Sequence, residues 1–184
     1  MHFSVLPDAD LNPLPPLRVD IMSRMRGVSP FEELWERRTT IALSDPASSS
    51  EAFVDLLSLS DLVNARKTQR DKDWPMLRRL VDASYASARD ADVSEAQIEF
   101  WLAELRSPEF LQEVVAQFPG QASRSHRPAV IAARGDGDIA QSLANEQSAE
   151  MVADRAYWLP LRRELEVLRH AARRPAGGDQ TGLA

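Results

Sequence analysis

Apolar residues recur every three or four positions after Tyr85, which is the spacing of amphipathic helices. Ser94 precedes the first such pattern, and its hydroxyl can accept a backbone N–H from the first helical turn, while Ser107 and Pro108 begin the second pattern. The apolar positions of these two helices are Ile98, Trp101, Leu102, Leu105, Leu111, Val114, Val115 and Phe118. The pattern predicts an all-helical domain over residues 89–174.

The polar stretch 121–138 interrupts this domain and predicts a loop with one helical turn at 129–133. Asp138 can then cap a further helix. Beyond Pro160 the apolar residues that recur at helical spacing are Leu161, Leu165, Leu168 and Ala172. They recur opposite charged residues, so this segment is a candidate surface for a partner protein. Residues 175–184 have no packing pattern and are expected to form a disordered tail.

The first half of the chain predicts short strands. The strand candidates are residues 2–6, 17–21, 39–43 and 53–57. Ser29 and Pro30 have the form of a capping box at the start of a short helix. These elements predict a small mixed sheet with flanking helices over residues 1–88, so the expected fold class is α+β.

The most ordered concentration of charge lies in residues 57–80, between two amphipathic helices. Ser60 can cap the first helix, and Asp71 or Asp73 can cap the second. The charged residues that fall in the joint and at its edges are Lys67, Arg70, Lys72 and Asp73. Such a joint can present several cations to a polyanion. The alternative is a solvated joint with local ion pairs, each contributing roughly 0 to 1 kcal/mol if exposed.

This segment, together with the strand-like residues 17–22 and the residues 29–43 that follow, resembles the polymerase-beta-like nucleotidyltransferase superfamily. The relatives suggested are small bacterial proteins of the toxin or abortive-infection type. In that resemblance Asp20 has the place of the third catalytic, metal-binding carboxylate. The residues that match the K-x-x-R-x-K-D element near the nucleotide triphosphate are Lys67, Arg70, Lys72 and Asp73. The matching region, residues 17–85, is under half of the chain.

The chain departs from the superfamily at the first catalytic motif. A working member has a Gly-Ser turn and a strand with two aspartates, but this sequence contains no Gly-Ser pair. Asp8 and Asp10 imitate the two aspartates, although their proline-rich surroundings predict a connecting loop. The resemblance therefore implies a partial nucleotidyltransferase that is inactive alone, within a toxin–antitoxin or phage-defence system. Mg²⁺ is expected as a cofactor only if the missing carboxylates come from an upstream segment or another chain.

The composition of the chain excludes several kinds of site and several classes of protein. The chain has no cysteine, which excludes disulfides and thiolate metal sites. No segment has the apolar length of a membrane span, and the first residues lack the pattern of a signal peptide, so a cytoplasmic protein without membrane partners is expected. The net charge of −6 argues against indiscriminate nucleic-acid binding. The four tryptophans are expected to anchor cores.

Two alternatives to the nucleotidyltransferase hypothesis remain open. A catalytically empty interaction module would bind a cognate protein through its helical half, especially residues 161–172. A nucleic-acid-binding protein would show salt-dependent affinity. Its basic side chains would be Arg66, Lys67, Arg70, Lys72, Arg78 and Arg79. The expected partners are accordingly a nucleoside triphosphate, a protein or a nucleic acid.

Overall fold

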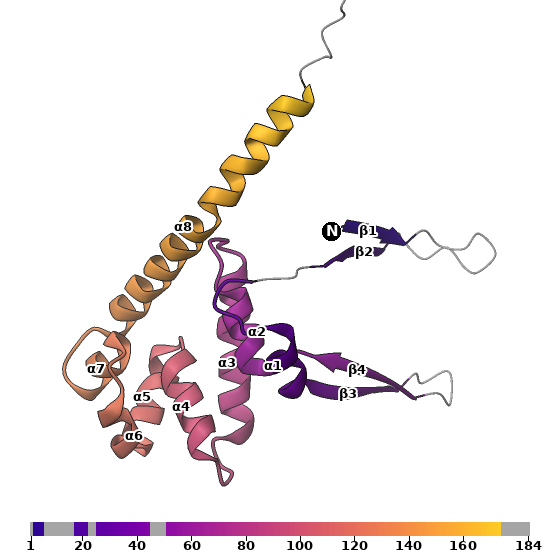
Figure 1. The fold of residues 1–184 in the computed structure, drawn as a ribbon. Coiled ribbons are helices and arrows are strands. Elements are labelled where there is room, and N and C mark those ends of the chain that lie inside the picture. The colour runs from indigo at the N-terminus through magenta and orange to yellow at the C-terminus, as the bar shows by residue number, and fades with distance from the viewer. Residues whose placement is uncertain (1, 6–16, 22–24, 45–50, 174–184) are drawn as a thin grey trace, which may run out of the picture. The chain divides into compact units, whose positions relative to one another are not determined.

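The computed structural model describes residues 2–5, 17–21, 25–44 and 51–173. The chain divides into two compact units, Met1–Ala65 and Arg66–Ala184. Figure 1 shows the strands in the first unit and a succession of helices in the second. The predicted α+β class with a helical C-terminal region is confirmed.

Two antiparallel strand pairs supply the strands of the first unit. β1 (His2–Val5) pairs with β2 (Leu17–Asp20), and β3 (Thr39–Ser44) pairs with β4 (Glu51–Leu56). Within the described residues each pair is a separate two-stranded sheet, so the predicted mixed sheet is wrong. The physical reason is that consecutive strands pair directly with each other. A parallel pair would need a longer crossover connection between its strands.

Two short helices also begin in the first unit. α1 (Phe31–Glu36) has no side-chain cap, so the predicted capping box does not form. α2 (Leu59–Arg66) ends at the boundary between the units. Its cap is Ser58 instead of Ser60, because Ser58 Oγ accepts the Asp61 backbone N–H at 3.2 Å. Ser60 lies inside the first turn, where its hydroxyl is no longer placed to cap the helix.

Helices make up the described part of the second unit. They are α3 (Asp73–Ala88), α4 (Glu95–Glu104), α5 (Pro108–Gln117), α6 (Pro119–Arg124), α7 (Pro128–Arg134) and α8 (Ile139–Arg173). Ser94 Oγ accepts the Gln97 N–H at 3.2 Å, which confirms the predicted cap of α4. α7 confirms the predicted helical turn at 129–133, whereas α6 occupies part of the predicted loop. Pro119 and Pro128 favour these helix starts because proline suits the first helical position.

The core of the second unit draws on α3, α4 and α5. Trp101 is fully buried, and the Tyr85 ring meets it edge-on with the ring centroids 5.2 Å apart. The other large, fully buried side chains of this unit are Leu77, Val81, Leu105, Leu111, Val114 and Val130. Because α3 contributes to this core, the structure divides before α3, whereas the sequence placed the boundary after residue 88. The predicted tail, residues 175–184, lies outside the described residues.

α8 is a single helix of 35 residues. Asp138 Oδ1 accepts the Gln141 N–H at 2.9 Å, which confirms the predicted cap. The helix continues through Pro160, although a proline removes one backbone hydrogen bond from a helix interior. No helix among the described residues is long and apolar enough to cross a membrane.

Candidate functional site

The candidate site is the segment of residues 66–73 between α2 and α3, which we call the basic joint. It holds four of the five predicted site residues. Arg70 and Lys72 are exposed to solvent. Lys67 is largely covered, and Asp73 is buried. The joint therefore divides the predicted phosphate ligands into two exposed cations and two enclosed side chains.

Lys67 pairs with a carboxylate at the end of α4. Its Nζ lies 2.6 Å from Glu104 Oε1, and the two side chains are only 15% and 12% exposed. An ammonium group removed from water needs such a partner to compensate its charge. The contact gives Lys67 a structural role, since it ties the joint to α4.

Asp73 and Trp74 close the joint on the first turn of α3. Asp73 Oδ2 accepts the Thr68 hydroxyl at 2.6 Å, and Trp74 Nε1 donates to the Thr68 carbonyl at 3.0 Å. Neither Asp71 nor Asp73 occupies the capping position before α3, which is held by Lys72 without a side-chain bond. The predicted aspartate cap is wrong because Asp73 is already the first helical residue and its carboxylate engages Thr68.

α8 holds the joint from the other end of the sequence. Asp154 is buried, and one of its oxygens accepts the Gln69 backbone N–H at 2.9 Å. Its other oxygen accepts Trp158 Nε1 at 3.1 Å. Sequence reasoning missed Asp154, because no local motif marks an aspartate whose partner lies 85 residues away. The backbone of the joint is thus fixed by contacts to α3, α4 and α8.

A cleft of about 410 Å³ lies beside Lys67. The charged residues in its lining are Lys67, Arg106, Arg127, Glu146 and Glu150. Arg127 donates to Glu146 Oε2 at 2.9 Å, and its other nitrogens donate to the carbonyls of Leu102 and Leu105. Arg127 therefore stabilises the end of α4, and its charge is compensated within the cleft wall.

Arg106 is the most enclosed cation of the cleft. Its guanidinium lies over the Trp74 ring, 4.8 Å from the centroid, and 3.7 Å from Glu104. Burial lowers the pKa of Arg106, because the charged form loses hydration. Arg106 is therefore enclosed between an aromatic ring and a carboxylate, unlike the exposed cations of the joint.

The predicted metal ligand Asp20 lies on β2, opposite His2 in the strand register. The side chain of Asp20 is outside the described residues. Across the part of the chain that the structure describes, no three histidine, cysteine or acidic side chains gather to hold a metal ion. The catalytic role of Asp20 and the binding of Mg²⁺ stay predictions.

The surface expected for nucleic-acid binding is partly engaged in protein contacts. Arg78 Nε donates to Ser107 Oγ at 2.8 Å, and Lys67 is paired with Glu104. Arg78 is nevertheless exposed, and the other exposed members of the set are Arg66, Arg70, Lys72 and Arg79. Among the described residues of this set, these last four side chains can reach a phosphate without breaking the contacts that Lys67 and Arg78 make.

Comparison with known proteins adds no relative to this description. No protein-family model matches the chain, and no curated protein or solved structure matches it. The resemblance to nucleotidyltransferases therefore rests on the sequence motif alone.

Proposed function

We propose that this chain is a nucleotidyltransferase-like protein whose basic joint binds the phosphates of a nucleoside triphosphate, and that it does not transfer the nucleotide by itself. The observation that carries the proposal is a fixed joint with exposed cations. Lys67 and Gln69 are held by α4 and α8, while Arg70 and Lys72 remain exposed beside them. A fixed backbone lowers the ordering cost of binding, so exposed cations on it suit a polyanion.

The residues of the joint have different roles in this proposal. Arg70 can bond two phosphate oxygens at once through its planar guanidinium, whereas Lys72 acts as a point charge. Lys67 and Asp73 position the joint through Glu104 and Thr68. The matching element therefore combines two ligands with two positioning residues.

The proposed absence of transfer follows from the chemistry of the reaction. A hydroxyl attacks the α-phosphate and pyrophosphate leaves, and two Mg²⁺ ions held by several carboxylates usually neutralise the developing charge. Asp20 can supply one carboxylate. Transfer would need others from a further segment or from a partner chain, for which a toxin–antitoxin or phage-defence system is the context that the resemblance suggests.

Calorimetric titration with ATP and GTP in the presence of Mg²⁺ tests the binding site. We expect Arg70→Ala to weaken triphosphate binding roughly tenfold or more, as is typical for loss of a charge-assisted hydrogen bond. Arg79→Ala is the matched control, since it removes an exposed arginine from α3. The control should bind as tightly as the wild type. Equal loss in both variants would contradict a site at the joint and favour a diffuse basic surface.

Incubation of the purified chain with labelled triphosphates and candidate acceptors tests the second half of the proposal. We expect no transfer with Mg²⁺ present. Robust transfer that is lost in Asp20→Asn would overturn the proposal that the chain is inactive by itself. The binding proposal would fail separately if the wild type showed no heat of triphosphate binding.

A further inference from the structure

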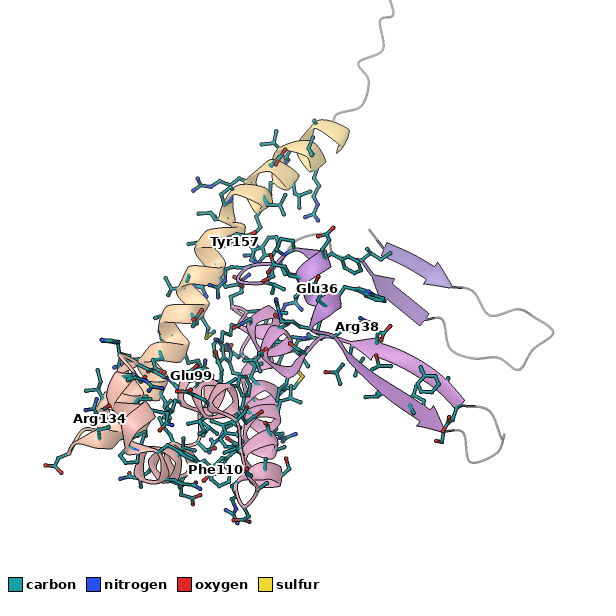
Figure 2. All side chains as sticks on the ribbon, turned by 60° about the horizontal axis from the view of Figure 1, so that its bottom comes forward. Glu36, Arg38, Glu99, Phe110, Arg134 and Tyr157 are labelled. Atoms are coloured by element: carbon teal, nitrogen blue, oxygen red, sulfur yellow. The ribbon has the colours of Figure 1, made fainter. Side chains whose placement is uncertain are left out.

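The C-terminal part of α8 carries an exposed apolar line. Leu161, Leu165 and Leu168 are 44%, 42% and 58% exposed. In Figure 2 this part of α8 follows Tyr157, which is itself half-exposed. Three large apolar side chains are exposed along one helix face. Covering them with another apolar surface lowers the free energy, so this face is a candidate interface.

The spacing of the leucines is that of a coiled-coil seam. Successive leucines are separated by four and then three positions, so they occupy positions d, a and d of a heptad. Trp158 takes the preceding a position. Pro160 falls at position c on the outer side of the helix, where its ring does not enter the seam.

The charges beside the seam select a second copy of the chain in parallel orientation. Glu164 lies at position g, while Arg162 and Arg169 lie at position e. In a parallel pair, position g faces position e of the next heptad, so each Glu164 would face Arg169 of the other copy. An antiparallel pair would instead bring arginines at e positions together, which is unfavourable.

We propose that α8 forms a parallel two-stranded coiled coil with a second copy of this chain, through Trp158, Leu161, Leu165 and Leu168. The inference goes beyond the proposed function, since the seam includes no residue of the basic joint. Its consequence is a protein with two joints, one from each copy.

Sedimentation equilibrium of the full chain tests the seam. The wild type should sediment at twice the chain mass of 20.5 kDa. Leu168→Asp should sediment as a monomer with unchanged helix content. Val167→Asp is the matched control, because Val167 is the adjacent apolar residue, is 67% exposed and lies outside the seam. It should remain a dimer.

Two results would overturn the proposed seam. One is a monomeric wild type at hundreds of micromolar protein. The leucines would then pack against another part of the chain or against a different protein. The other is equal dissociation of the Leu168→Asp and Val167→Asp variants.

A charge exchange and a single cysteine test the parallel orientation. Glu164→Arg should weaken the dimer roughly tenfold, because it replaces two attractions by two repulsions. The Glu164→Arg, Arg169→Glu double variant should restore it.

The chain has no cysteine, so Leu161→Cys adds the only thiol, and oxidation should link two copies through equivalent d positions. A dimer that does not cross-link, or that the exchange does not restore, would overturn the parallel arrangement.

Discussion

Lys67 Nζ lies 2.6 Å from Glu104 Oε1 in a largely buried ion pair that joins the basic joint to α4. We expect Lys67→Ala to lower the free energy of unfolding by roughly 2 to 4 kcal/mol, because it leaves a buried carboxylate with one cation fewer. Urea unfolding measures the change, and Lys72→Ala is the exposed control, with an expected effect within about 0.5 kcal/mol. Equal stability of Lys67→Ala and Lys72→Ala would contradict the structural role of this pair.

The ion pair of Asp61 is expected to make the stability of the first unit depend on pH in acid. Arg37 donates to both of its oxygens, at 2.9 and 3.2 Å, and Ser58 Oγ donates at 2.6 Å. The Arg37 hydrogen bonds are the main cause that holds the pKa of Asp61 below its ordinary 3.8. A lowered folded-state pKa means that Asp61 stabilises the fold above that ordinary value, and that this stability is lost as pH falls through the folded pKa.

Thermal unfolding between neutral pH and strong acid measures this contribution. We expect the melting temperature of the wild type to fall more steeply below the ordinary aspartate pKa than that of Asp61→Asn, which cannot titrate at this position. Identical acid dependence in the two proteins would show that Asp61 does not stabilise the folded state through its charge.

The enclosed hydroxyl of Tyr85 is expected to make the stability of the second unit depend on pH in alkali. Burial, together with the Glu113 carboxylate at 3.0 Å, raises the pKa of Tyr85 to about 12 from 10.0. Because the folded-state pKa is raised, the associated stability is present below pH 10.0 and is lost as pH rises toward 12. The expected loss is roughly 1 to 3 kcal/mol.

Tyrosinate absorbance measures the pKa directly. In Tyr157→Phe, Tyr85 is the remaining tyrosine of the chain, so its titration is resolved. Glu113→Gln in that background should move the pKa partly back, since burial still acts. A transition at the ordinary value in the folded protein would contradict the enclosed position of the ring.

Gly137 and Gly120 form a matched pair for alanine substitution. A Cβ on Gly137 would lie 2.8 Å from Ala132 Cβ and 2.9 Å from Ala132 Cα, so Gly137→Ala should destabilise the fold by roughly 1 to 3 kcal/mol. A Cβ on Gly120 meets no atom within 4 Å. Gly120→Ala in α6 should therefore stabilise by roughly 0.4 to 1 kcal/mol. Thermal unfolding of both variants checks the opposite signs; a neutral Gly137→Ala would mean that the α7–α8 turn can shift.

The sequence by itself determined the elements whose signals are local. Ser94 and Asp138 were recognisable as caps because each accepts an N–H three residues further along the chain. The four strands were recognisable from short apolar and β-branched segments, although not their division into two separate pairs. Even here the start of α2 was misplaced by two residues, since Ser58 and Ser60 are equally good capping residues by type.

The tertiary structure alone decided which side chains are buried and which distant residues contact them. Of the four tryptophans, Trp74 and Trp101 are buried as predicted, but Trp35 is 47% exposed and lies under Arg38. The partner of Lys67 is 37 residues away and the partner of Gln69 is 85 residues away. Such contacts depend on how whole helices pack, and no local pattern encodes which of many carboxylates will meet a given cation or backbone N–H.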